Sequence, residues 1–197
     1  MKIISKYKFA TGKQIKTLAD FSSLNTCDRR LRKLIEAGYI QRKYFIYGVP
    51  ALYFTTKLAQ DFFNLEYITS DIRIDKIKHE VNVTNTAIYF INHMKIPDYS
   101  LITERELKHE DGFCRQKHRP DFIYNNNQKV CVEVEMTEKS KERLERNIRD
   151  NYLNFDTQYW IVSNEKIKNN IQKLQSRYTN IEIIELETIK KYIKSLE

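Results

Sequence analysis

The chain begins with two segments in which apolar residues recur at helical spacing. Residues 11–21 form the first segment, and Thr11 is of a type that caps helix N-termini. Residues 22–40 hold the second helix, which we expect to stop at Gly38, because glycine accepts the left-handed conformation that follows many helices. The apolar positions of this second helix are Cys27, Leu31, Leu34 and Ile35.

Two β-rich runs follow, at residues 39–47 and 51–56, on either side of a short break at residues 48–50. They predict a hairpin, and the chain then predicts a further helix through Phe63. Helix, turn, helix, hairpin and helix is the order of a winged helix-turn-helix. Such a unit places its second helix in the major groove of DNA, while the hairpin, or wing, contacts the backbone.

The pattern changes after residue 71 to longer helices that alternate with strands. The expected helices are 71–93, 139–155, 165–178 and 187–196, and the expected strands are 100–108, 120–124, 129–137, 158–163 and 181–186. This order predicts a mixed sheet flanked by helices. The helix at 139–155 is highly charged, and its expected buried stripe is Leu144, Ile148, Tyr152 and Phe155.

These patterns predict an α+β protein of two domains. Residues 1–66 are expected to form a winged-helix DNA-binding domain, and residues 71–197 an α/β core with a mixed sheet. A chain of 197 residues, 41% of them hydrophobic, is long enough to bury a substantial core in this arrangement.

The formal net charge of +8 is concentrated in the first third of the chain. Residues 1–60 hold twelve Lys or Arg and three Asp or Glu, a net charge of +9, whereas residues 61–197 carry a net charge of −1. Such a local excess is typical of a module that binds a polyanion; the alternative is an ordinary solvated surface. The candidate DNA-binding residues are Arg29, Arg30, Arg32 and Lys33 on the second helix and Arg42 and Lys43 on the hairpin.

The cysteines and the hydropathy of the chain bear on its compartment. Cys27, Cys114 and Cys131 are scattered, odd in number and lack Cys-x-x-Cys spacing, which favours a reducing environment. The N-terminus lacks the apolar stretch of a signal peptide, and no run approaches the ~20 apolar residues of a membrane span. We therefore expect a cytoplasmic protein with no membrane partner.

Two acids interrupt the apolar strand at residues 129–137. Glu133 and Glu135 lie among Val, Cys and Met, and the alternation of a strand points both side chains to one face. One interpretation is a sheet with one face in water. The other is that Asp121, Glu133 and Glu135 gather around Mg²⁺ or Mn²⁺, ions that prefer carboxylate oxygens.

Asp121 joins the two glutamates only if the preceding hairpin has the right register. A four-residue loop at 125–128 would place Asp121 on the opposite face. A three-residue loop of Asn125–Asn127 would pair Asp121 with Cys131 and place all three acids on one face, and asparagine tolerates the left-handed turn this needs. A bulge near Pro120 would serve equally well.

A divalent ion held by these acids would lower the pKa of a bound water and neutralise charge in the transition state of phosphodiester cleavage. A lysine often assists by holding or deprotonating the attacking water. Here Glu135 stands two residues beyond Glu133, and Lys139 and Lys141 lie about one turn further along. The candidate catalytic residues are therefore Asp121, Glu133, Glu135 and Lys139.

This arrangement resembles the PD-(D/E)xK, or restriction-endonuclease-like, superfamily. The matching residues are Pro120 and Asp121 on one strand and Glu133 and Glu135 on the next, preceded by a helix that bears Glu80. The resemblance implies a nuclease-like α/β core with Mg²⁺ or Mn²⁺ as cofactor and Glu80 as an additional ligand. The sequence departs from the motif at Glu135, where a lysine is usual.

A closer resemblance covers most of the chain. A basic winged helix followed by KHEVNVTNTAIYF, ITEREL, HRPDFIY and VEVEMTEKS is similar to the replication-relaxation proteins of plasmids and integrative elements, and to mobilisation relaxases of the same nuclease fold. Two functions from different classes follow. One is a metal-dependent DNA nickase or endonuclease that acts in replication or mobilisation. The other is a non-catalytic DNA-binding accessory protein or a transcription regulator.

The expected partners follow from these functions. Double-stranded DNA is the first, and other replication or mobilisation proteins are the second. A palindromic DNA target would also require a homodimer.

Overall fold

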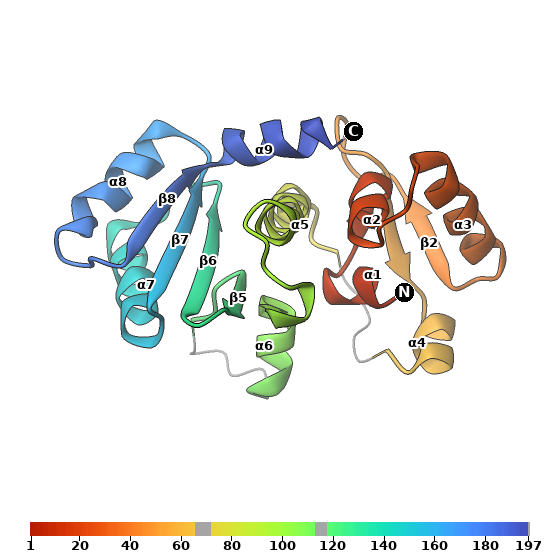
Figure 1. Cartoon of the computed structure of the whole chain (residues 1–197), viewed down its shortest axis with the longest axis horizontal. Helices are drawn as coiled ribbons and strands as arrows, with labels where there is room; N and C mark the ends of the chain where they lie inside the picture. The colour runs from red at the N-terminus through yellow and green to blue at the C-terminus, as the bar shows by residue number, and fades with distance from the viewer. Residues whose placement is uncertain (66–71, 113–117, 197) are drawn as a thin grey trace. The chain divides into compact units, whose positions relative to one another are not determined.

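A computed structural model describes residues 1–65, 72–112 and 118–196 of the chain (Figure 1). Within them the backbone forms two compact units. The first is Met1–Ile88 together with Leu196, and the second is Tyr89–Ser195. The predicted boundary at residues 66–71 lies outside the described residues, as does Cys114.

The first unit combines short helices with a small antiparallel sheet of order β1-β3-β2. Its elements are α1 (Lys2–Lys6), β1 (Ala10–Thr11), α2 (Gly12–Leu18), α3 (Leu24–Glu36), β2 (Ile40–Lys43), β3 (Leu52–Thr55), α4 (Lys57–Phe63) and the 3₁₀ turn η1 (Ile74–Lys76). One buried cluster joins the three strands with α1, α2 and α3: Ile4, Ala10, Ile15, Cys27, Leu31, Ile40 and Tyr53. The sequence pattern did not predict α1 and β1, which are too short to show a period.

Local hydrogen bonds fix the ends of the two central helices. The Thr11 side chain accepts from the Gln14 amide, and the Gln14 side chain accepts from the Thr11 amide, so α2 begins with a complete capping box. The Ser23 hydroxyl caps α3 by accepting from the Thr26 amide. Gly38 follows the end of α3 with a φ of +75°. The predicted cap at Thr11 and the predicted stop at Gly38 are confirmed.

The second unit is built on a five-stranded mixed sheet of order β4-β5-β6-β7-β8. Its elements are the second part of α5 (Ile77–Asn92), η2 (Asp98–Ser100), β4 (Leu101–Thr103), α6 (Glu104–Glu110), β5 (Phe122–Asn125), β6 (Lys129–Glu135), α7 (Lys141–Asn154), β7 (Thr157–Val162), α8 (Glu165–Gln175), β8 (Ile181–Glu185) and α9 (Leu186–Ser195). The β4–β5 and β5–β6 pairs are antiparallel, and β6–β7 and β7–β8 are parallel. The predicted α+β class and mixed sheet are confirmed.

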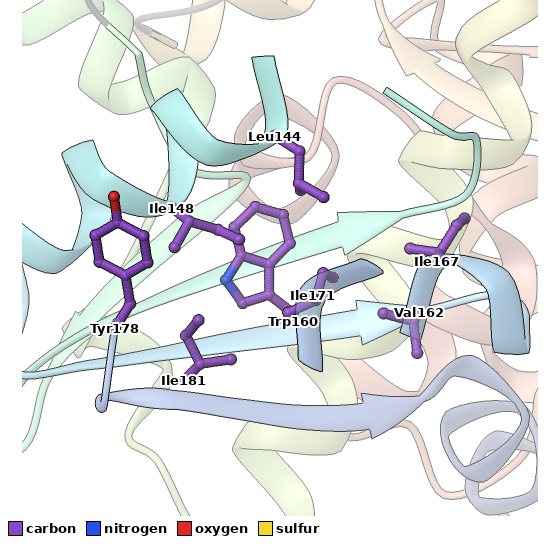
Figure 2. Packing of buried hydrophobic residues seen from close by; sticks show 8 residues of the cluster. All are labelled: Leu144, Ile148, Trp160, Val162, Ile167, Ile171, Tyr178 and Ile181. Atoms are coloured by element: carbon purple, nitrogen blue, oxygen red, sulfur yellow. The ribbon is translucent and has the colours of Figure 1, made fainter. Parts of the chain in front are cut away.

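Helices cover both faces of this sheet. On one face, side chains of α7 and α8 pack on β7 and β8 around the fully buried Trp160 (Figure 2). On the other, Phe90 of α5 makes ring contacts with Phe122, Tyr124 and Tyr159. The central strand β6 is consequently buried on both sides, except at its first residue.

Two sequence predictions need correction. The strand expected at 100–108 ends at Thr103, because the Thr103 hydroxyl and the Glu106 carboxylate form a capping box that starts α6. Tyr152 is 41% exposed instead of belonging to the buried stripe of α7, and its ring contacts Tyr178 edge-on.

In the part of the chain that the structure describes, no helix combines the length and the apolar character needed to cross a bilayer.

Candidate functional site

The β5–β6 hairpin sets the position of Asp121. Asn125 pairs with Lys129 and Phe122 with Val132, so the loop is residues 126–128. The loop has the predicted length of three residues but lies one residue further along the chain than expected, and Asp121 therefore does not pair with Cys131. Since the shift in pairing is two residues, the side-chain alternation is preserved and Asp121 falls on the face of Glu133.

A hydrogen bond holds Asp121 against the neighbouring strand. Its Oδ2 accepts from the backbone amide of Val134 at 2.7 Å, and its carbonyl accepts from the amide of Glu104 at 2.8 Å. The carboxylate is therefore fixed beside the peptide unit that separates Glu133 from Glu135.

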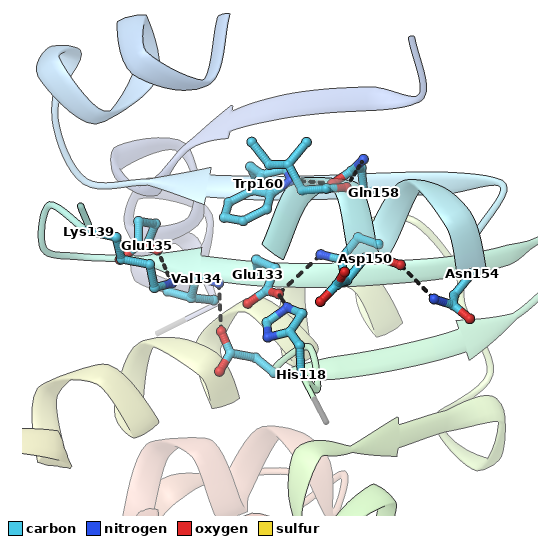
Figure 3. Close-up of polar contacts among 12 residues, drawn as sticks. His118, Glu133, Val134, Glu135, Lys139, Asp150, Asn154, Gln158 and Trp160 are labelled. Atoms are coloured by element: carbon cyan, nitrogen blue, oxygen red, sulfur yellow. Dashed lines mark hydrogen bonds and ion pairs between the residues drawn. The ribbon is translucent and has the colours of Figure 1, made fainter. Parts of the chain in front are cut away.

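Glu133 is buried and held by two side chains. It is 5% exposed, its Oε1 lies 2.7 Å from His118 Nε2, and the same oxygen accepts from Asn151 Nδ2 of α7 at 3.2 Å (Figure 3). The alternation of β6 places this carboxylate on the face where Trp160 occupies the next strand. Two partners on one oxygen restrict the orientation of Glu133.

Glu135 is equally buried, at 4% exposure, and forms an ion pair with Lys139 (Figure 3). Burial raises the pKa of this carboxyl above its ordinary value, and the nearby charges of Glu133 and Asp121 raise it further, while Lys139 lowers it only in part. The three acids thus interact electrostatically, and the ionised form of Glu135 is less favourable in the folded protein than in water.

Burial excludes the simpler interpretation of the acidic strand. A water-exposed sheet face would leave Glu133 and Glu135 solvated. Both side chains are instead buried, Glu133 next to Asn151 of α7 and Glu135 next to Lys139, which precedes α7. Buried carboxylates require a compensating charge or hydrogen bonds, which here come from His118, Asn151 and Lys139.

The donor chemistry of this acid group (Asp121, Glu133 and Glu135) suits a hard divalent cation, since all three supply carboxylate oxygens. Their present arrangement does not form a complete ligand set. Among residues 1–65, 72–112 and 118–196, no group of three or more His, Cys, Asp or Glu side chains is arranged to hold a metal ion. Each carboxylate is instead turned to a protein partner.

Other acids considered as ligands have structural partners. Glu80 is in the part of α5 that belongs to the first unit, and its carboxylate pairs with Lys8. Glu104 pairs with Lys108 along α6, 2.5 Å away.

The predicted DNA-binding residues of the first unit are all exposed. In the described residues none of the six forms an ion pair with an acid, so their charge is available to an external anion. Arg42 donates to the Tyr44 hydroxyl at 2.6 Å and lies over the Tyr44 and Tyr53 rings. The six residues are Arg29, Arg30, Arg32, Lys33, Arg42 and Lys43.

Comparison with known families adds a decisive observation. The model of the replication-relaxation family matches residues 1–167. The chain belongs to the replication-relaxation family. The resemblance seen in the sequence motifs is thereby confirmed at the level of this family, and the family description fits a role in replication or mobilisation of plasmids or mobile elements. No curated protein and no solved structure matches the chain.

The match to the replication-relaxation family covers both candidate surfaces. Residues 1–167 include the exposed cations of α3 and the hairpin, as well as the complete acid group and its partners His118, Lys139 and Asn151. The family match therefore extends over both units of the chain.

Asn151 was not among the residues selected from the sequence. Its signal was present, because Asn147 and Asn151 interrupt the buried stripe of α7 next to Leu144 and Ile148. A buried asparagine needs a hydrogen-bond partner, and Glu133 provides one for Asn151.

Proposed function

We propose that this replication-relaxation protein binds double-stranded DNA of a plasmid or mobile element through its first unit and cleaves a DNA strand at the acid group, with Mg²⁺ or Mn²⁺ as cofactor. The observation that carries the proposal is the placement of Asp121 between two buried glutamates by its bond to Val134. Because like charges this close repel one another, a bound divalent cation would stabilise the group beyond what its protein partners provide.

The acid group supplies the residues that would hold the ion: Asp121, Glu133 and Glu135. A bound divalent ion activates water and stabilises the charge that develops on a reacting phosphate. His118 and Asn151 orient Glu133, and Lys139 pairs with Glu135. Lys139 also supplies a positive charge next to the acids, which is the role of the lysine that the motif usually has at the position of Glu135.

The order of the strands supports the nuclease-like interpretation. The order α5, β4, α6, β5, β6, α7, β7 gives four neighbouring strands, with two of the acids on β6 and Asp121 directly before β5. This is the arrangement expected of a restriction-endonuclease-like core, and fold alone does not establish an activity. The chemistry of the acid group must therefore carry the functional argument.

DNA binding is assigned to the first unit. Helix α3 presents four cations without acidic partners among the described residues, and the β2–β3 hairpin adds Arg42 and Lys43. A winged helix-turn-helix uses these two elements for the major groove and the backbone, respectively. Binding and cleavage are therefore separable by mutation.

A non-catalytic accessory function is the second candidate. It is favoured by the fact that every carboxylate of the acid group already has a protein partner and that Glu135 replaces the usual lysine. In that function the acids, His118 and Lys139 form a buried polar network that stabilises the second unit, and the protein acts by binding DNA alone.

The two candidates differ in one assay. Supercoiled plasmid carrying the origin of the native element is incubated with full-length protein and Mg²⁺ or Mn²⁺, and open-circular and linear products are separated by electrophoresis. The proposal predicts nicking or linearisation that requires the metal and is lost in Glu133→Gln, with DNA affinity unchanged. Intact supercoiled plasmid with the wild-type protein, under conditions where the DNA is bound, would refute cleavage and support the accessory function.

A further inference from the structure

A second feature of the second unit lies next to the acid group. Helices α7 and α8 enclose a cavity of about 220 Å³. Its lining combines four polar side chains with two apolar ones: Lys139, Lys141, Asn170, Lys173, Leu144 and Leu174. We call it the lysine pocket.

The lysine pocket has an excess of cationic side chains. Three lysines line it, and no acid is among its described lining residues. Lys141 and Lys173 are exposed and form no ion pair with any residue in the described parts of the chain, so their charges remain available. Three uncompensated or partly compensated cations around one cavity favour an anionic ligand.

The apolar side of the lysine pocket further restricts the class of ligand that fits it. Leu144 and Leu174 belong to the hydrophobic cluster around Trp160, so they give the cavity a rigid wall. Asn170 adds a side chain with both donor and acceptor groups. A ligand with a phosphate, a sugar and a flat ring would satisfy the lysines, the asparagine and the leucines together.

Lys139 connects the lysine pocket to the acid group. It lines the cavity and at the same time pairs with Glu135 (Figure 3). A phosphate in the pocket would therefore lie one side chain away from the acids proposed to cleave a phosphodiester. The ammonium group of Lys139 would be attracted by a phosphate in the pocket and repelled by a cation at the acid group.

We propose that the lysine pocket binds one nucleotide of a single DNA strand, with its phosphate on Lys141 and Lys173, and so positions that strand beside the acid group. This inference rests on the proposed function, because only a strand that is to be cleaved needs to be held there. Sequence-independent binding of single strands relies on a positively charged groove that follows the phosphate backbone.

Lysine footprinting tests the proposal on the full-length protein. The protein is acetylated with an amine-reactive ester, with and without the single-stranded tetranucleotide dT4, and modification is quantified by mass spectrometry. Lys141 and Lys173 should be protected by dT4, whereas Lys190, an exposed lysine of α9 paired with Glu187, should not. Equal modification of Lys141 and Lys173 with and without dT4 would overturn the proposal.

A binding measurement gives an independent readout. Trp160 is the sole tryptophan and packs in the cluster that includes Leu144, so its fluorescence reports on this unit. The double variant Lys141→Gln/Lys173→Gln should weaken dT4 binding about tenfold or more, since a charge-assisted hydrogen bond is worth about 1.5 kcal/mol or more. Lys190→Gln/Lys194→Gln on α9 removes the same number of charges and should bind like the wild type.

Competing ligands distinguish a DNA strand from other phosphate compounds as the ligand of the lysine pocket. Inorganic phosphate and ATP are titrated alongside dT4; stronger protection of Lys141 and Lys173 by either of them would contradict a DNA strand as the ligand. The experiments distinguish failure of the pocket assignment from failure of the proposed cleavage. If Glu133→Gln abolishes nicking but dT4 protects neither lysine, the pocket assignment fails while cleavage stands. If dT4 protects the lysines but no metal supports nicking, cleavage fails.

Discussion

The carboxylate of Asp121 accepts a hydrogen bond from the backbone amide of Val134, 2.7 Å away. This bond joins the residue before β5 to the strand that carries Glu133 and Glu135, and it fixes Asp121 beside them. The hydrogen bond to Val134 requires an acceptor oxygen at position 121, whereas the repulsion between the three acids requires the negative charge of Asp121.

Substitutions at Asp121 should separate these two contributions. Asp121→Asn keeps an oxygen that can accept from Val134 and removes one of the clustered charges, so we expect its stability to equal or exceed that of the wild type. Asp121→Ala leaves the Val134 amide without this partner and should lower the free energy of unfolding by about 1–3 kcal/mol. Urea denaturation of both variants measures the difference, and equal stability of the two would show that the hydrogen bond is unimportant.

The raised pKa of Glu135 makes stability depend on pH. Because its folded-state pKa lies above the ordinary value of 4.5, the folded protein binds this proton more tightly than the unfolded chain does. Stability from this group is then present at low pH and is lost as pH rises through the folded pKa.

Glu135→Gln should remove that dependence. In the presence of EDTA, we expect the Tm of Glu135→Gln minus that of the wild type to be smallest near pH 4 and to increase toward pH 7. Thermal denaturation at a series of pH values tests this. A difference that stays constant across the series would mean that burial of this carboxylate has no net cost.

The exposed cations of α3 should dominate DNA affinity. Charge reversal of Arg29 and Arg32 to Glu should weaken binding of duplex DNA by at least about tenfold at moderate salt and flatten its salt dependence, because fewer counterions are released. Lys190→Glu/Lys194→Glu on α9 provides a control with the same change in net charge. Equal losses in both double variants, measured by fluorescence anisotropy, would exclude a specific role for α3.

Substitutions on α7 should destabilise the protein only on the helix face that packs in the core. Ile148 is fully buried in the cluster around Trp160, whereas Leu153 on the same helix is 72% exposed. Ile148→Ala should lower the free energy of unfolding by about 2–5 kcal/mol, and Leu153→Ala should change it by less than about 0.5 kcal/mol. Chemical denaturation measures both, and a large loss in Leu153→Ala would contradict the orientation of α7.

The face shared by the acids was predictable from the sequence, but their register was not. Side-chain alternation alone places Glu133 and Glu135 together, and any loop that preserves the alternation adds Asp121. The position of the loop depends on which asparagine adopts the left-handed conformation, and in the structure it is Asn127, at a φ of +62°. Three consecutive asparagines give a sequence no basis for that choice.

Competition between strand and helix signals explains why the strand predicted at residues 100–108 ends at Thr103. Ile102 and Thr103 are β-branched and favour a strand, yet Thr103 and Glu106 have the spacing of a capping box, which favours a helix. The partners of Glu133 could not be derived from the sequence at all, because His118 and Asn151 come from segments far apart in the chain. Only the tertiary structure brings them to one carboxylate.

Binding of a divalent metal ion by Asp121, Glu133 and Glu135 can be tested by metal-dependent thermal stability, without knowledge of the DNA target. The Tm of the full-length protein is measured in EDTA and at increasing Mg²⁺ or Mn²⁺. A ligand that binds only the folded state raises stability in proportion to the logarithm of its concentration above Kd. We predict such a rise for the wild type and its loss in Glu133→Gln; an unchanged Tm, or an equal rise in both proteins, would contradict a metal site at the acid group.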